Sequence, residues 1–181
     1  MKISAQEEYG LRCLLQIARR GDPASLSITE IAEAEGLSAP YAAKLLALLR
    51  QEGFIESTRG RSGGYRLNRP AIEIRLGSVL TALGEHLFTE GDFCQKHAGT
   101  ETTDGACVHS GGSCNLRSLW QTLESWMRHT LDGLTLADLL QNEQSVAELM
   151  RQRLAVTLTA PPEETISLVP LNIRPRTAGV V

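Results

Sequence analysis

Three of the four cysteines in this sequence fall within one stretch of the chain, and thiolates that lie close together can share a metal centre. Twelve residues separate Cys94 from Cys107, and six separate Cys107 from Cys114. Thiolates bind iron in iron–sulfur clusters, bind structural zinc, or join as a disulfide that responds to oxidants. The spacing lacks the Cys-x-x-Cys pairs of most zinc sites, which weighs against zinc without excluding it. The residues therefore predict a thiolate-ligated centre or a metal-free thiol switch.

The chain around these cysteines has little capacity to order itself. Residues 89–113 contain five glycines and no hydrophobic period, so they cannot bury enough apolar surface to offset the loss of chain entropy. A metal centre would hold this segment, and His97 and His109 stand within it as further candidate ligands. Cys13 stands apart, next to Leu14 in an apparent helix, and we expect it to be a buried structural thiol.

Two short helices joined by a tight turn are predicted near the start of the chain. A first helix over residues 5–20 is followed by Ser27-Ile28-Thr29-Glu30, a capping box that should open a second helix ending near Gly36. Ser38 is expected to cap a third helix that runs to Gly53. This pair predicts a helix-turn-helix, with Ala42, Leu45, Leu46 and Leu49 facing inward and Ser38, Ala39, Tyr41 and Lys44 pointing elsewhere.

A hairpin with a basic, glycine-rich tip is expected next. Residues 54–58 and 65–67 read as two strands, and the tip between them carries Arg59 and Arg61 among glycines. Glycines let the backbone approach a phosphate chain closely, and an arginine on such a tip can enter a narrow minor groove. The hairpin therefore predicts the wing of a DNA-binding domain.

The second half of the chain carries a broad apolar stripe. After a linking helix over residues 76–87 and the cysteine segment, apolar side chains recur every three or four residues. They are Leu116, Leu119, Trp120, Leu123, Trp126, Met127 and Leu131. A long apolar helix outside a winged-helix domain predicts a homodimer that reads two half-sites of a near-palindromic operator in double-stranded DNA. Thr135-Leu136-Ala137-Asp138 should cap one more helix to about Leu154.

These elements predict a mainly α protein, with a winged helix-turn-helix domain, a cysteine-bearing loop and a long dimerisation helix. We expect a DNA-binding domain over residues 1–70, a linking helix over 71–88, a cysteine-bearing loop over 89–114 that would bind the thiolate-ligated centre, dimerisation helices over 115–154 and a tail of unknown role over 155–181.

The bulk composition fits a regulator of this kind in the cytoplasm. The formal net charge is −3, but residues 1–70 hold 10 Lys+Arg against 8 Asp+Glu, a net +2 that gives weak support for a DNA partner. No signal peptide and no apolar run long enough to span a membrane is found in the sequence. An enzyme is not predicted, because Cys107 and His109 are too close in a flexible segment to align as nucleophile and base.

Several of these residues together resemble one superfamily of bacterial regulators. The run from Gly53 to Leu67 is similar to the wing signature of the Rrf2 superfamily, which includes the iron–sulfur cluster regulator IscR and the nitric-oxide-sensing NsrR. Further similar stretches are Met1-Lys2-Ile3-Ser4, Glu8-Tyr9-Gly10-Leu11, Ile31-Ala32, and the turn Gly36-Leu37-Ser38 with Tyr41 beyond it. The resemblance covers about residues 1–150 and leaves out the tail.

The resemblance implies a winged-helix repressor with a long helix that crosses to its dimer mate. Recognition residues would be Ser38, Ala39, Tyr41 and Lys44 in the major groove, with Arg59 and Arg61 reaching the minor groove. The three cysteines would hold an iron–sulfur cluster whose state sets the affinity for DNA. The signal would be iron supply, oxidants or nitric oxide.

The fourth ligand of that cluster differs among the members of the superfamily. The iron–sulfur assembly regulators have a histidine three positions after the third cysteine, and Arg117 stands there in this chain. Other members take a carboxylate from the first helix of the opposite subunit, and Glu8 stands at the matching position. The resemblance therefore implies Glu8 as the fourth ligand, with His109 or His97 as alternatives, and leaves the cluster as 2Fe–2S or 4Fe–4S.

Overall fold

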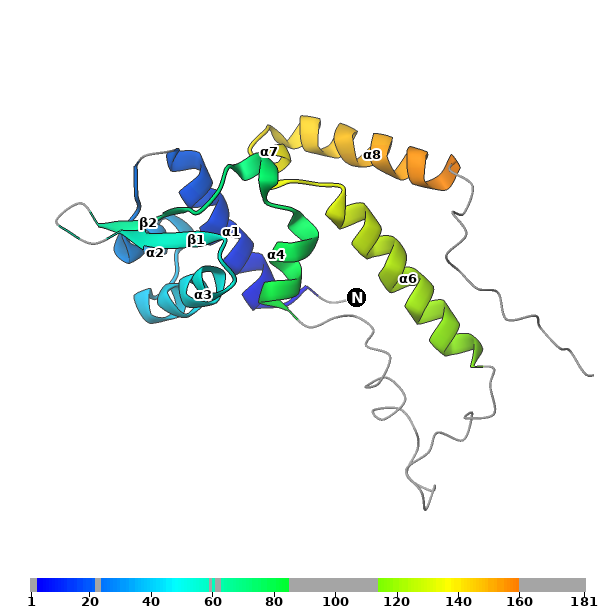
Figure 1. Cartoon of the computed structure of the whole chain (residues 1–181), viewed down its shortest axis with the longest axis horizontal. Helices are drawn as coiled ribbons and strands as arrows, with labels where there is room; N and C mark the ends of the chain where they lie inside the picture. The colour runs from blue at the N-terminus through cyan, green and yellow to red at the C-terminus, as the bar shows by residue number, and fades with distance from the viewer. Residues whose placement is uncertain (1–2, 22–23, 59, 61–62, 85–113, 160–181) are drawn as a thin grey trace, which may run out of the picture.

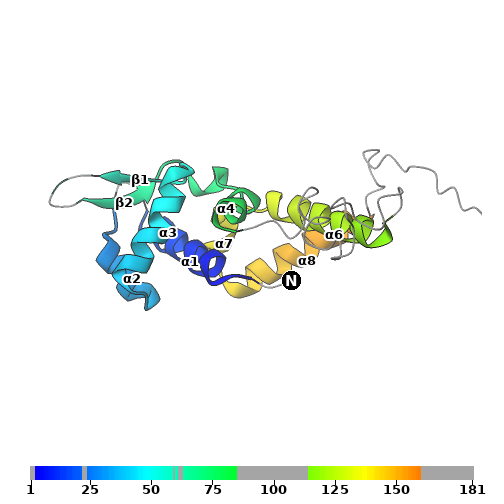
Figure 2. The same cartoon turned by 90° about the horizontal axis from the view of Figure 1, so that it is seen from below.

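The protein folds into a helical head with an extended helical arm (Figures 1 and 2). The computed structural model describes residues 3–21, 24–58, 60, 63–84 and 114–159, and only the backbone of residues 154–159. The head contains α1 (Ala5–Arg20), α2 (Ile28–Glu35), α3 (Ala39–Gln51), β1 (Ile55–Thr58), β2 (Gly64–Leu67), η1 (Ala71–Glu73) and α4 (Leu76–Leu83). The arm contains α6 (Asn115–Asp132) and α8 (Glu143–Thr159), with the short α7 (Leu136–Leu139) between them. The predicted mainly α winged-helix fold is confirmed.

Local capping signals define where the first helices begin. Ser4 and Glu7 form a capping box at the start of α1, and Ser27 and Glu30 form the predicted one at the start of α2. Helix α1 spans the predicted residues, Ala5–Arg20. The α1, α3 and α4 helices enclose one apolar core that includes Cys13, Leu14, Ile17, Ile31, Leu45, Leu46, Leu49, Val79 and Leu83. The predicted inward face of α3 is confirmed, since Ala42 is fully buried along with its three leucines.

The wing is attached to the rest of the head by a third strand-like segment. Strands β1 and β2 are antiparallel, with Ile55 opposite Leu67 and Thr58 opposite Gly64. Tyr65 also exchanges two backbone hydrogen bonds with Leu26, at 3.0 and 2.7 Å. A Cβ atom at Gly64 would lie 2.5 Å from the Leu26 carbonyl oxygen, so this close approach requires glycine.

Two predicted helix boundaries were wrong, and one predicted capping bond is not made. Ser38 is the N-cap residue of α3 but makes no side-chain capping bond, because Pro40 removes one of the two amides that an N-cap side chain can reach. Helix α4 ends at Leu83, where the extended backbone of Gly84 terminates it. The predicted helix over residues 135–154 is two helices, since Asn142 accepts a bond from the Ser145 amide and starts α8 afresh.

The end of α6 is fixed to the head by backbone pairing. Leu76 N–H donates to the Leu134 carbonyl at 3.0 Å, and Leu136 N–H donates to the Ile74 carbonyl at 2.8 Å. Leu134 and Leu136 are buried at this junction, with Leu136 fully enclosed in the core of the head. The arm is therefore anchored to the head at the end of α6. None of the helices in the described part of the chain is long and apolar enough to cross a membrane.

Replacing Leu136 with alanine should lower the free energy of unfolding by about 2–5 kcal/mol, because a fully buried leucine leaves a cavity in the core. The matched control is Leu140→Ala, since Leu140 is 37% exposed just after the same short helix and should cost less than about 1 kcal/mol. Urea unfolding at one fixed protein concentration measures both. Equal losses in the two variants would contradict the anchoring role of Leu136.

Candidate functional site

The start of α3 presents the predicted DNA-reading residues unevenly. Ser38, Ala39 and Lys44 are exposed, whereas Tyr41 is half-buried and packs against the core. The ring of Tyr41 meets that of Tyr9 edge to face, with centroids 6.2 Å apart and planes at 81°. Tyr41 therefore helps to hold α1 against α3 rather than pointing freely outward as expected.

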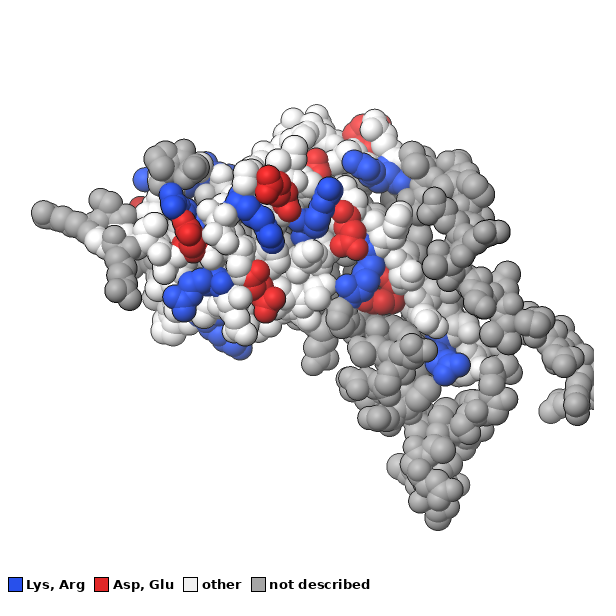
Figure 3. Space-filling view, viewed as in Figure 1, with Lys and Arg blue, Asp and Glu red and all other residues white. Residues whose placement is uncertain are grey.

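The wing strands β1 and β2 lie at the edge of the head that is far from the arm (Figure 1). Arg59 and Arg61 lie outside the described residues. Next to them, the Gly64 N–H donates to the Thr58 hydroxyl at 3.2 Å, which closes the base of the tip. Acidic and basic side chains alternate over the face of the head in Figure 3, so contacts at particular side chains matter more here than a broad basic field.

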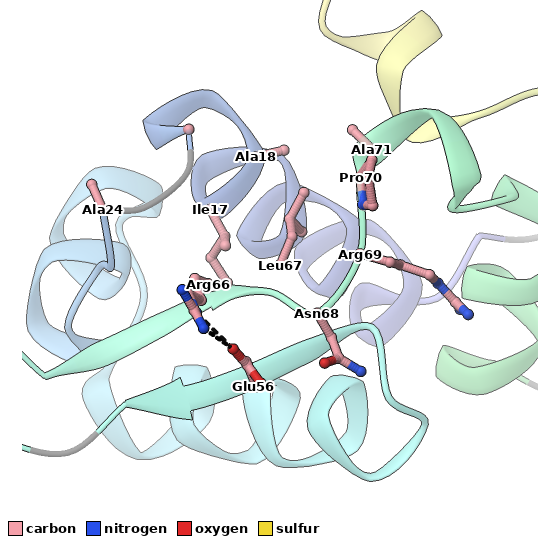
Figure 4. A pocket seen from close by; sticks show the side chains of 11 residues that line it. Ile17, Ala18, Ala24, Glu56, Arg66, Leu67, Asn68, Arg69, Pro70 and Ala71 are labelled. Carbon is pink, nitrogen blue, oxygen red and sulfur yellow. Dashed lines mark hydrogen bonds and ion pairs between the residues drawn. The ribbon is translucent and has the colours of Figure 1, made fainter.

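A shallow pocket of about 440 Å³ lies between the wing strands and the end of α1 (Figure 4). Glu56 of β1 and Arg66 of β2 face each other across the sheet in this pocket. The Arg66 guanidinium donates to Glu56 Oε1 from two nitrogens, at 2.6 and 2.5 Å. This cross-strand pair braces the wing, and it depends on the strand register, which the sequence pattern alone does not fix.

Only one of the three clustered cysteines lies in the described part of the chain. Cys114 is the N-cap residue of α6, is half-buried, and accepts a bond at its Sγ from the Arg117 amide at 3.4 Å. Cys94, Cys107, His97 and His109 lie outside the described residues. Among the residues that are described, no three potential metal ligands come together.

Glu8 lies on α1 and is engaged by a neighbouring arginine. Arg12 Nε donates to Glu8 Oε1 at 2.7 Å, and this bond raises the pKa of Arg12 above its usual range. The same guanidinium lies 5.7 Å from the centre of the Tyr9 ring, which in turn contacts Tyr41. Successive contacts thus connect Glu8 with the start of α3. The first of these contacts, the Glu8–Arg12 ion pair, has a signal in the sequence, because side chains at positions i and i+4 of a helix are neighbours.

The N-terminal end of α1 also contacts the end of α4, where the described chain leaves the head. Gln6 Nε2 donates to the Leu83 carbonyl at 2.5 Å, and Gly84 fits closely against the side chain of Glu7. The helix that carries Glu8 is therefore fixed beside the point from which the cysteine segment departs.

The family match covers most of the chain. Residues 3–142 match the family described as Rrf2, iron-dependent transcriptional regulator. The chain belongs to the Rrf2 family.

Individual Rrf2 relatives agree with this assignment. The transcriptional regulator IscR of Serratia proteamaculans is 29% identical over 93% of this chain and 98% of its own length. The structure of T. potens IscR superposes with a TM-score of 0.59 and 28% identity, covering 77% of this chain and 86% of that one. CymR, the global cysteine regulator of B. subtilis, gives a TM-score of 0.60 and 28% identity, covering 77% and 96%. The protein is thus an IscR-like, DNA-binding transcriptional regulator of the Rrf2 family and not an enzyme.

The fourth cysteine of this Rrf2 protein is chemically separate from the cluster candidates. Cys13 is fully buried, which confirms the predicted structural thiol. Burial, together with the nearby Glu35 carboxylate, raises the pKa of Cys13 to about 11. The pKa of Cys13 is higher in the folded protein than in the unfolded chain. The contribution of this protonated thiol to the free energy of unfolding is therefore complete below about pH 8.5 and is lost as the pH rises towards 11.

Iodoacetamide should therefore alkylate Cys13 at least about 100-fold more slowly than Cys114 in the folded, metal-free protein at pH 8. Peptide mass spectrometry measures the two rates, and protein unfolded in urea is the control in which both thiols react. The free energy of unfolding should also fall more steeply between about pH 9 and pH 11 in the wild type than in Cys13→Ala. Similar alkylation rates in the folded protein would contradict the buried, protonated thiol.

Proposed function

We propose that this protein is a homodimeric repressor whose iron–sulfur cluster reports iron supply, oxidants or nitric oxide and sets the affinity for a near-palindromic operator. One observation carries the proposal. Cys114, the last residue of the cysteine segment, is also the N-cap residue of α6, whose other end is fixed to the DNA-binding head. A change in the ligation of Cys114 therefore acts directly on a helix that is joined to the head.

The surface of α6 supports the homodimer. Its apolar stripe is exposed in the single chain, with Leu116 at 62%, Leu119 at 49% and Trp126 at 41%. Trp120 and Leu123 are exposed to a similar degree on the same helix. Large apolar side chains gathered in this way mark a protein–protein contact, and a second copy of the same helix is the partner we propose.

The α3 helix and the wing support the DNA contact. Ser38, Ala39 and Lys44 are exposed at the start of α3, where a recognition helix reads base edges and phosphates in the major groove. The Ser38 hydroxyl makes no capping bond with α3, which leaves it available for such a contact. Tyr41 is proposed to position α3, and Arg59 and Arg61 are proposed to reach the minor groove.

The proposed ligands are Cys94, Cys107 and Cys114, together with Glu8 of the partner subunit. When bound, a cluster of either type supplies reversible redox and ligand-exchange chemistry. The donor chemistry fits, since three thiolates are soft ligands for iron and one carboxylate is a weaker, exchangeable one. Arg12 donates to one carboxylate oxygen of Glu8, Oε1, and also lies over Tyr9, so ligation of Glu8 would act on the Arg12 contact. These contacts connect the proposed ligand site with α3.

A second candidate keeps the DNA binding but uses the cysteines without a cluster, as a thiol switch or with structural zinc. The likeness to CymR favours it, because one matched structure is the oxidised form of Staphylococcus aureus CymR, at 31% identity and a TM-score of 0.58.

Protein purified without oxygen should contain iron and acid-labile sulfide in comparable amounts if the cluster is present. Cys114→Ala should lose both, whereas Glu8→Ala should keep them but lose iron faster on exposure to a chelator. Cys13→Ala is the matched control, because it removes a buried thiol outside the ligand set and should leave the iron content unchanged. Stoichiometric zinc without sulfide, or a protein free of metal, would contradict the iron–sulfur cluster and support the second candidate.

A further inference from the structure

The α4 and α6 helices are joined by a polar contact as well as by the backbone pairing at their ends. We infer that Arg128 of α6 and Thr81 of α4 form a strut that sets the angle between the head and the dimer helix. Through that angle, the strut selects the spacing of the two half-sites that the protein accepts. The inference rests on the proposed function as a homodimer that reads two half-sites.

The strut joins residues that are 47 positions apart in the sequence. Arg128 NH1 donates to the Thr81 hydroxyl at 3.0 Å, and that hydroxyl donates to the Gly77 carbonyl at 2.9 Å. The guanidinium is held in turn by the buried Glu124, whose Oε1 accepts from two of its nitrogens at 3.1 Å each. Each group in this chain of bonds is oriented by the next one.

One end of α6 is a fixed pivot. Asp132 packs so closely on Gly77 that a side chain at that position would collide with its carboxylate. Directly beyond Asp132, the backbone bonds at Leu134 and Leu136 join the chain to the segment that opens α4. Movement of α6 relative to the head is therefore reduced to a rotation about this end.

Arg128 lies close to this pivot, so a small change in its contact is amplified along α6. It lies one helical turn from Asp132, about 6 Å along the axis, whereas Leu116 at the other end of the stripe lies about 24 Å away. A rotation that displaces Arg128 by about 1 Å moves Leu116 by about 4 Å. Because α6 carries the proposed dimer contact, the same rotation changes the distance between the two heads.

The contact is directional, which suits it to fixing an angle. Apolar packing tolerates sliding, whereas a forked guanidinium between a carboxylate and a hydroxyl has one good geometry. The residues at positions 124, 128 and 132 recur every four positions and so share the face of α6 that meets α4. The exposed apolar stripe lies on another face of α6, where the partner subunit is proposed to pack.

The hydroxyl end of the strut is the better target for mutation, because removal of Arg128 would leave the buried Glu124 carboxylate without its guanidinium. Thr81→Val keeps the shape and removes the hydroxyl, and Thr81→Ser restores it. Thr122→Val is the matched control, since the Thr122 hydroxyl bonds only one turn back along α6, to the Ser118 carbonyl at 2.8 Å. The probe is a duplex selected by the wild type from a random library, rebuilt with its half-sites one or two base pairs closer together or farther apart.

The wild type, Thr81→Ser and Thr122→Val should prefer one spacing. In Thr81→Val the preference for that spacing over its neighbours should fall roughly three- to tenfold, with little change in melting temperature. An unchanged spacing preference in Thr81→Val would overturn the strut while leaving the proposed function intact. If the wild type itself binds no selected duplex, or binds all spacings equally, both the strut and the proposed two-half-site reading are wrong.

Discussion

The backbone pairing between residues 74–76 and 134–136 is the constraint on which the rest of the architecture depends. These two segments are far apart in sequence, and they bring the end of α6 onto the start of α4 with bonds of 3.0 and 2.8 Å. The burial of Leu134 and Leu136 makes the junction part of the core of the head. The cysteine segment connects the far ends of the same two helices. A group that binds this segment would therefore act on two helices that are already joined at their other ends.

The two faces of α6 differ in composition and in the contacts that they can make. The face toward α4 is polar, with Glu124 and Arg128 in a chain of bonds to Thr81, and it orients the helix. The apolar face is exposed and would supply the driving force for the proposed association, since burying large apolar side chains is the main favourable contribution in most protein contacts. Within the head, the contact between Tyr9 and Tyr41 couples α1 to α3. The proposed ligand site, dimer contact and DNA-reading helix would thus be connected through one small core.

Features set by neighbouring residues were predictable from the sequence, and features set by distant ones were not. The Ser27–Glu30 capping box, the α1 boundaries and the inward face of α3 are local, and all three are confirmed. The failure of Ser38 to cap α3 was also local, but the effect of Pro40 on the available amides was overlooked. The packing of Tyr41, the Glu56–Arg66 pair and the Arg128–Thr81 contact depend on register and tertiary approach, which no periodicity reveals. The cysteine ligand set stays a prediction, since two of its members lie outside the described residues.

In the proposed function, chemistry at the cysteines changes the affinity for DNA. The most direct test is the dissociation constant of one anaerobic preparation for its selected operator duplex, measured before and after the iron is removed with a chelator. Salt concentration must be held constant, because phosphate contacts make the affinity strongly dependent on it. The two dissociation constants should differ by at least about tenfold. Equal dissociation constants, with iron and sulfide shown to be present in the first state and absent from the second, would contradict the proposed function.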